Sequence, residues 1–301
     1  MEANKILFFK ERNTGEILEA TLDFLKINWR PILKMGFLVF FPLALLQGWM
    51  MDNMMGTMMS RDFLDGAGAG LTGTFWFNYA GTIITYTVGS LFSASLAMAL
   101  LMTYNERPQG LDQITFGDIK SLFTSNLWRQ LILTLVTFVL FIAAIFVVGI
   151  LIGLSAWTLL ITIPLMIWAV VSYVLSEPVY LIERQNVFSS VARGFRLGMA
   201  NWWMVFAVVL ILSIIVSIIS SVVSMPMYAV VIARNLLGGN SVGMSATLMG
   251  LLSYVGAIIT SFFNNLTSMI LIIAVAYIYG HAAERKDGIT IEEDIEKFDT
   301  L

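Results

Sequence analysis

The chain has 301 residues, of which 58% are hydrophobic and only 12% are charged, with a mean hydropathy of +0.84. This composition is too apolar for a soluble domain of ordinary type, so lipid must be the solvent for much of the chain. The net charge of −3 says little about nucleic acid, but the basic residues are spread along the chain among acidic ones, which argues against nucleic-acid binding. The absence of cysteine excludes disulfides, thiolate metal ligands and thiol nucleophiles.

Six uncharged or nearly uncharged runs are long enough to cross a bilayer, because a hydrocarbon layer of about 30 Å needs about 20 helical residues. They are residues 32–51, 75–104, 131–152, 157–176, 202–224 and 251–279. The first run contains Lys34, near enough to its end for the ammonium group to reach the surface. A different treatment of 157–176 or 225–237 gives five or seven spans. Because 225–237 contains Pro226 and Arg234, we interpret it as a surface or re-entrant segment.

The Lys and Arg residues fall in alternate gaps between these runs. Of the 17, all but Arg61 and Arg234 lie in the N-terminal arm, the second gap, the fourth gap or the tail. The positive-inside bias therefore predicts that both termini are cytoplasmic, and an even number of spans agrees. We expect a single integral membrane domain over 1–301, with an arm and first elbow at 1–30, a bundle at 31–280 and an acidic tail at 281–301.

Three amphipathic segments on the predicted cytoplasmic side each lead to a junction with Asn and Trp and then to an apolar run. A helix with one apolar stripe beside a span is expected to lie in the headgroup layer, with the Trp at the interface. The alternative is that these are the amphipathic loops common in polytopic proteins. The apolar positions are Leu18, Leu22, Leu25 and Trp29 in the first segment, Phe116, Ile119 and Phe123 in the second, and Phe188, Val191 and Phe195 in the third.

The predicted fold is therefore all-α, with six transmembrane helices arranged as three hairpins, each preceded by an amphipathic interfacial helix. Two side chains in the tail, His281 and Glu284, share a helical face. Two such groups do not make a metal site, so we expect them to have surface or interface roles.

Several stretches together resemble the glycerophosphoryl diester phosphodiesterase membrane-domain family. They are the opening 14–29, the run 177–183 with its continuation through 188–202, and the tail 279–288. The resemblance implies a six-span protein of the bacterial cytoplasmic (inner) membrane. His281 departs from the acidic residue that the family tends to have after the tail tyrosines. The phosphodiesterase reaction is not implied, because a catalytic barrel of some 250 residues with metal ligands is missing from this chain.

A cluster of methionines follows the first predicted span. Pairs that repeat every four residues lie on one face of a helix. Thioether sulfur is a soft ligand suited to Cu(I), which makes an external copper or silver contact chemically sensible. The alternative is flexible packing at a membrane boundary, which we favour because no His or Cys accompanies the sulfurs. The cluster consists of Met50, Met51, Met54, Met55, Met58 and Met59.

Small and polar residues also recur at helical spacing in three of the predicted spans. Such stripes permit close helix approach and interhelical hydrogen bonds, or they line a wet transport pathway. Asn264 and Asn265, in the last span, are the most polar candidates. The stripes are Gly81, Thr85, Gly89, Ser93 and Ala97; Ser213, Ser217, Ser220 and Ser224; and Gly256, Thr260, Asn264 and Ser268.

Glu177 is the exception to a nearly neutral membrane interior. It directly follows the fourth predicted span, where an acidic group is costly unless it is paired or hydrated. Arg193 or Arg196 of the following amphipathic segment would be a suitable partner and would fix that segment to the bundle. The alternative role for Glu177 is proton or substrate coupling.

The sequence contains no catalytic constellation that we can identify, neither a nucleophile beside a base nor a carboxylate pair within a span. We therefore expect a non-catalytic integral membrane protein that acts as a scaffold or as a partner-binding subunit of a membrane complex. The alternative is a transporter or lipid-handling protein. We expect contacts with membrane lipids and membrane-protein partners, and neither a cofactor nor nucleic acid.

Overall fold

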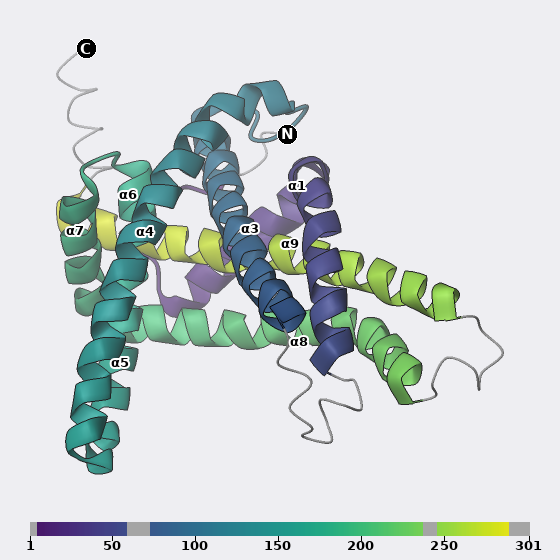
Figure 1. The fold of residues 1–301 in the computed structure, drawn as a ribbon. Coiled ribbons are helices and arrows are strands. Elements are labelled where there is room, and N and C mark those ends of the chain that lie inside the picture. Colours follow the sequence, from purple (N-terminus) through teal and green to yellow (C-terminus); the bar gives the residue numbers. More distant parts are fainter. Residues whose placement is uncertain (1–4, 59–72, 237–245, 289–301) are drawn as a thin grey trace. The chain divides into compact units, whose positions relative to one another are not determined.

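The computed structural model describes residues 5–58, 73–236 and 246–288, and this part of the chain contains only helices and their connections (Figure 1). Among the described residues, six helices are long and apolar enough to cross a membrane, and each overlaps one predicted span. The protein is therefore an all-α polytopic membrane protein. The elements are α1 (Thr14–Met58), α3 (Gly73–Glu106), α4 (Phe116–Leu154), the 3₁₀ turn η1 (Ala156–Thr158), α5 (Leu159–Tyr173), α6 (Ser176–Ile182), α7 (Val187–Ala200), α8 (Trp202–Leu236) and α9 (Ala246–Asp287).

The chain divides into two compact units. Unit 1 comprises the described parts of 1–31, 94–212 and 270–301, and unit 2 comprises those of 32–93 and 213–269. Four helices, α1, α3, α8 and α9, contribute residues to both units.

Two of the three predicted junctions interrupt a helix, and both do so with an Asn directly before a Trp. Asn28 has non-helical angles (φ −106°, ψ 17°), and its Nδ2 donates to the Phe24 carbonyl at 2.9 Å. Asn201 ends α7 with similar angles (φ −118°, ψ 28°) and donates from Nδ2 to the Leu197 carbonyl at 3.1 Å. In both cases the amide side chain donates to the carbonyl four residues earlier, and the Leu197 carbonyl also accepts from the backbone N–H of Asn201.

The second predicted elbow is not a separate helix, because α4 runs without interruption from Phe116 to Leu154. Here Asn126 is separated from Trp128 by one residue. Asn126 is buried, and its Oδ1 accepts a hydrogen bond from Arg184 at 3.5 Å. The Asn126 side chain therefore bonds to the α6–α7 turn and not to its own helix, and α4 continues.

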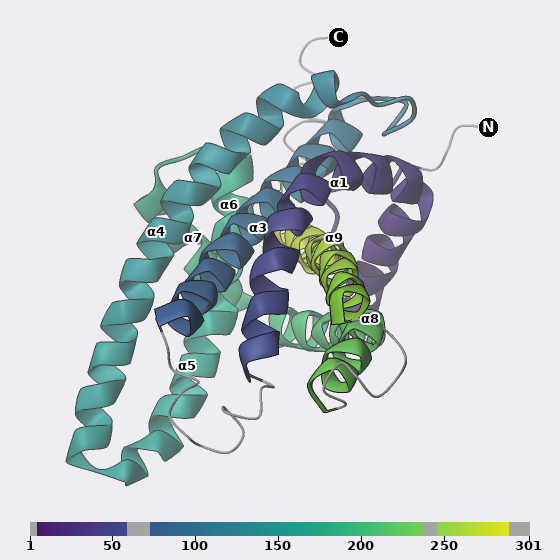
Figure 2. The same ribbon diagram turned by 45° about the vertical axis from the view of Figure 1, so that its right-hand side comes forward.

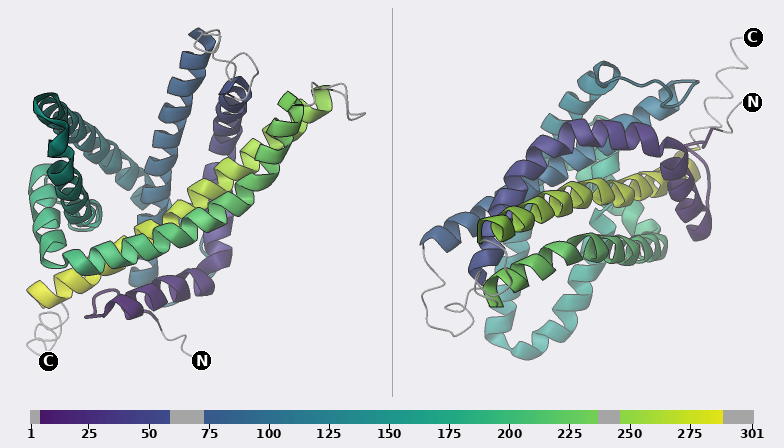
Figure 3. Two further views of the ribbon diagram at one scale, coloured as in Figure 1. Left: turned by 90° about the horizontal axis from the view of Figure 1, so that it is seen from below. Right: turned by 90° about the vertical axis from the view of Figure 1, so that its right-hand side faces the viewer.

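The described part of 225–237, which we interpreted from the sequence as a surface or re-entrant segment, continues α8, which runs through Pro226 to Leu236. Met227 and Val231 from this segment are buried in an apolar cluster of unit 2 with Met51 and Ala257. Burial of side chains after the proline stabilises the continued helix although one backbone hydrogen bond is lost. The unit 2 parts of α8 and α9 lie side by side (Figure 3), with Gly256 against Met227.

In unit 1, α4 and α5 form an antiparallel hairpin closed by η1 (Figure 2). In the most apolar 18-residue stretch of α4 no residue is buried. Phe138 and Phe146 are 60% and 69% exposed, and Leu160 and Ile161 of α5 are exposed as well. The outer part of this hairpin is therefore apolar around its circumference and free of protein contacts that would bury it.

The centre of unit 2 is a polar clamp made by Gln47 of α1, Thr85 and Ser93 of α3, and Asn265 of α9. Gln47 Nε2 donates to the Thr85 carbonyl at 2.9 Å, and Asn265 Nδ2 donates to Gln47 Oε1 at 2.7 Å. Ser93 Oγ donates to the Asn265 carbonyl at 3.0 Å. All four residues are buried, so the α3 stripe is used here to join helices.

Gly89 makes the polar clamp sterically feasible. A Cβ at this position would lie 2.5 Å from Gln47 Nε2 and closer still to Asn265 Oδ1. We expect Gly89→Ala to reduce the free energy of unfolding in detergent micelles by about 1–3 kcal/mol, because the two amides cannot move without losing their hydrogen bonds.

The matched control is Gly149→Ala on α4, where an added Cβ meets nothing within 4 Å. This variant should be neutral, or more stable by up to about 1 kcal/mol from helix propensity. Equal destabilisation by the two substitutions would contradict the proposed role of Gly89.

Candidate functional site

Polar side chains of unit 1 gather where the turn between α6 and α7 meets α4 and α9. Two glycines on α7 allow it to pack closely on the preceding helices: a Cβ at Gly194 would overlap the Ser176 backbone, and one at Gly198 would overlap the Ser172 carbonyl. The turn itself has a positive φ of 54° at Arg184, and Asn186 caps α7 by accepting from the Phe188 amide at 3.1 Å. The sequence analysis missed the Gly194–Gly198 pair, although glycines four residues apart are a recognised signal of close helix packing.

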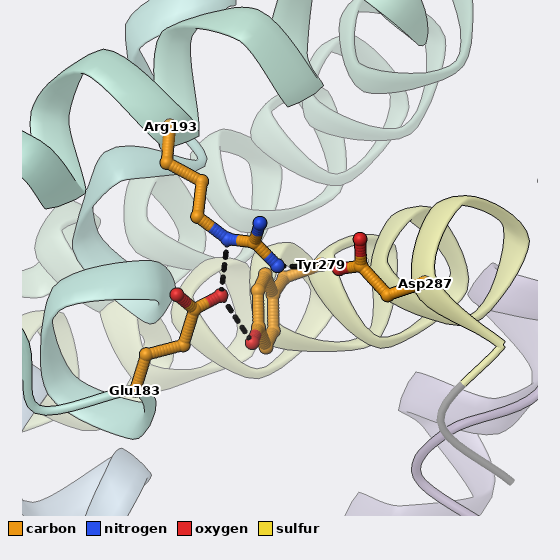
Figure 4. A network of polar contacts seen from close by, with 4 residues as sticks. All are labelled: Glu183, Arg193, Tyr279 and Asp287. Carbon is orange, nitrogen blue, oxygen red and sulfur yellow. Dashed lines mark hydrogen bonds and ion pairs between the residues drawn. The ribbon is translucent and has the colours of Figure 1, made fainter. Parts of the chain in front are cut away.

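Glu183 is the centre of a four-residue network (Figure 4) that joins the α6–α7 turn to α7 and α9. Its Oε1 accepts from Arg193 Nε at 2.7 Å and from the Tyr279 hydroxyl at 2.9 Å. Arg193 Nη2 also binds an Asp287 carboxylate oxygen. Burial lowers the pKa of Arg193, but the hydrogen bonds and charges of Glu183 and Asp287 outweigh this effect and raise the pKa above its ordinary value. The guanidinium is therefore permanently charged.

Arg129 of α4 fixes the same turn from the other side. Its Nη2 donates to the Tyr180 carbonyl at 2.7 Å and to the Gln185 carbonyl at 2.8 Å, and its guanidinium lies 4.0 Å from the Tyr180 ring centroid. Arg184 reaches back to α4 and donates to Ser125 Oγ at 2.9 Å. The α6–α7 turn is thus held through the backbone carbonyl of Gln185 and the Arg184 side chain, which are hydrogen-bonded to side chains of α4.

The structure corrects the expected pairing of Glu177. Arg193 does fix its elbow helix to other elements, but through Glu183 and Asp287. Arg196, the other candidate, is exposed on α7 and takes part in no ion pair within the described residues. Glu177 lies in the first turn of α6, where its carboxylate is hydrogen-bonded by the Gln130 side chain of α4. The position along α6 decides which glutamate pairs with Arg193. Glu183 directly follows α6 and is next to α7, whereas Glu177 is in the first turn of α6.

The N-terminal arm covers the unit 1 part of α9. Ring contacts of Phe8 with Tyr277 (5.9 Å between centroids) and Tyr279 (6.3 Å) place it over the helix. Gly280 lies so close that an added Cβ would be 2.5 Å from the Phe8 carbonyl oxygen. The backbone N–H of Arg12 donates to His281 Nδ1 at 2.9 Å. Of the two expected roles for His281, surface or interface, the surface role does not hold, because the side chain is buried under the arm. Because Nδ1 accepts, the proton of its neutral ring is on Nε2.

The two asparagines singled out on α9 have different environments. Asn265 belongs to the polar clamp, whereas Asn264 is half-buried and its carbonyl accepts from Thr267 Oγ1 at 3.3 Å. Of the serine stripe of α8, Ser213 and Ser217 line an open groove of about 420 Å³ together with Ser221, which is outside the predicted stripe. Ser224, at the other end of the stripe, is buried.

The described methionines of the predicted cluster are used in packing. Met50 lies against Gly81, and Met51 is in the apolar cluster of unit 2, where its sulfur accepts from the Tyr86 hydroxyl at 3.1 Å. Met54, Met55 and Met58 are half-buried, and Met59 lies outside the described residues. These contacts favour the packing interpretation over an external site for a soft metal.

No protein-family model, curated protein or solved structure matches this chain. The chemistry of the site must therefore be argued from its own residues. Across the described ranges, no group of three or more His, Asp or Glu side chains is placed to hold a metal ion. What the arrangement provides is a charged network, a buried acid–amide pair and an arm closed over α9. Gln130, Glu183, Tyr279 and Asp287 were missed by the sequence analysis because their only signal is tertiary contact.

We expect Glu183→Gln and Arg193→Gln each to lower the free energy of unfolding in micelles by about 1–3 kcal/mol, since each removes an ion-pair partner from a partly buried charged group. The double variant should cost less than the sum of the single variants. Arg196→Gln, on the exposed side of the same helix, is the control and should be neutral. Additive effects, or an equal effect of the control, would contradict a coupled network.

We expect Gly280→Ala to open the arm, because the added methyl group displaces the Phe8 carbonyl. Arg12 is buried in the closed arm, so tryptic cleavage after it should be slow in the parent protein and markedly faster in the variant. Gly250→Ala on the same helix, where an added Cβ meets nothing within 4 Å, should leave the cleavage rate unchanged. If both variants are cleaved like the parent, the contact between Gly280 and Phe8 does not hold the arm.

Proposed function

We propose that this chain is a non-catalytic integral membrane protein that binds a partner membrane protein through the α4–α5 hairpin. The observation that carries the proposal is the lack of burial on α4. Its most apolar stretch has no buried residue, whereas 61% of the corresponding stretch of α3 is buried. A helix so placed presents its whole outer surface to whatever occupies the membrane beside it.

One face of α4 suits contact with another helix in particular. Gly149 and Gly153 are one turn apart, and an added Cβ at either meets nothing within 4 Å. Glycines at this spacing let a second helix backbone approach closely, and association in lipid depends on such packing because the hydrophobic effect does not distinguish protein from acyl chains. Ile142 and Phe146 lie on the same face, 51% and 69% exposed, and flank the glycines with large side chains.

The proposed orientation follows the charge pattern of the sequence. With the arm, the α6–α7 turn and the tail in the cytoplasm, the charged network around Glu183 belongs to the cytoplasmic side, and η1 lies on the other side. We further propose, from the resemblance to the phosphodiesterase membrane-domain family, that the membrane is the bacterial cytoplasmic membrane. The charged network then stabilises the base of the hairpin, and the hairpin itself makes the contact.

A lipid-handling role is the second candidate, and the open groove on α8 is the observation that favours it. The groove combines serine hydroxyls with Ile214, Ile218 and Val222, a surface suited to an acyl chain. Against it, the small residues of α3 are used in the packing of unit 2, as Gly81 and Gly89 show.

Single-cysteine crosslinking tests the proposed function directly, because the chain contains no cysteine of its own. Ile142→Cys and Phe146→Cys on the glycine face of α4 should each give one discrete crosslinked species in native membranes. Val222→Cys on α8, 66% exposed, is the matched control and should not give it. Equal crosslinking at the control, or adducts with lipid alone at all three positions, would overturn the proposal.

A further inference from the structure

Two buried oxygen atoms of unit 1 lack hydrogen-bond partners and belong to side chains that contact one another. The first is Oε1 of Glu177, in the first turn of α6, and the second is Oε1 of Gln130, on α4. The side chains of these two residues are joined by a hydrogen bond. Gln130 is 8% exposed, and although Glu177 is half-buried as a residue, its Oε1 is enclosed.

The chemistry of the two groups makes this pairing incomplete when Glu177 is ionised. A carboxylate only accepts hydrogen bonds, whereas a primary amide donates from nitrogen and accepts at oxygen. The amide N–H can satisfy one carboxylate oxygen. The other carboxylate oxygen and the amide oxygen are both acceptors, so they cannot bond to each other, and both remain buried at a cost.

Protonation of Glu177 gives both of these oxygen atoms a hydrogen bond. A carboxylic acid accepts from an amide N–H at its carbonyl oxygen and donates its O–H to the amide oxygen, so the two side chains form two parallel hydrogen bonds. We propose that Glu177 and Gln130 form a proton-binding site, in which Glu177 carries a proton and donates it in a hydrogen bond to Gln130 Oε1. No bond other than this O–H is made or broken, and the proton comes from water.

The neighbouring charged groups have other partners. Arg129 on α4 donates to the Tyr180 and Gln185 carbonyls, and Arg193 on α7 binds Glu183 and Asp287. Tyr173 at the end of α5 interacts electrostatically with Glu177, and its hydroxyl is hydrogen-bonded to Thr137 Oγ1. Among the described residues, Arg129 and Arg193 are therefore bound to other acceptors. We infer that a proton neutralises the buried carboxylate of Glu177.

The site has a mechanical consequence, because α6 and α4 meet at this pair. Loss of the proton would place an uncompensated charge between the two helices and would weaken the contact that positions the α6–α7 turn. Proton binding at Glu177 would thus be linked to the order of this turn. This inference concerns the base of the hairpin and stands independently of partner binding at the glycine face of α4.

Infrared difference spectroscopy of the full chain in lipid nanodiscs, recorded across a pH titration, tests the site. The parent protein should show the carbonyl stretch of a protonated carboxyl group, and raising the pH should remove it. Glu177→Gln should lack this band at every pH, and Gln130→Leu should shift it because the hydrogen-bond acceptor is lost. Glu19→Gln, at an exposed acidic residue of α1, is the control and should retain the band.

A second measurement keeps the test independent of folding defects. Glu177→Gln creates two amides that can make the same two hydrogen bonds, so its melting temperature should stay within a few degrees of the parent value. Gln130→Glu places two acids together and should lower the melting temperature increasingly as the pH rises. A parent spectrum without the band, or a band that persists in Glu177→Gln, would overturn the proposal.

Discussion

Hydrocarbon offers no hydrogen-bond partners, so each polar group that a chain carries into the membrane must be satisfied within the protein. In unit 2 this constraint is met by the polar clamp, where Gln47 both donates to Thr85 and accepts from Asn265. Three helices contribute to it, and the close approach that it needs is possible because Gly89 has no side chain. The packing of the helices in this unit follows from satisfying two amide side chains.

The elements of unit 1 are joined by charged groups instead. The carboxylate of Glu183 has two donors, and the guanidinium of Arg193 has two acidic partners, so three separate segments are joined by one network. Arg129 adds hydrogen bonds to the carbonyls of Tyr180 in α6 and of Gln185 in the turn. The turn between α6 and α7 is consequently held on several sides, and this gives the adjoining α4–α5 hairpin a rigid base.

The outer half of that hairpin, in contrast, makes few contacts with the rest of the protein. It carries almost no polar side chains, so nothing in it requires a partner inside the protein, and its residues remain exposed. Lipid can cover such a surface, but Gly149 and Gly153 also leave room for the close approach of another helix. The proposed function therefore rests on the outer part of the α4–α5 hairpin, where few polar side chains need a partner within the protein.

The sequence by itself determined the number and approximate extent of the membrane spans, because the cost of placing charge in hydrocarbon leaves long uncharged runs such as 131–152. It also identified the Asn and Trp junctions, but not that a helix is interrupted at Asn28 and Asn201 and continues through Asn126. The amide of Asn28 and of Asn201 bonds to its own helix, whereas that of Asn126 bonds to Arg184 of the α6–α7 turn. The partners of Glu177, Arg193 and His281 were likewise decided only by the tertiary structure. The pairs Gln130–Glu177, Arg193–Asp287 and Arg12–His281 are 47, 94 and 269 positions apart in the chain. Helix packing and register bring them together, which local patterns of charge and hydropathy do not encode.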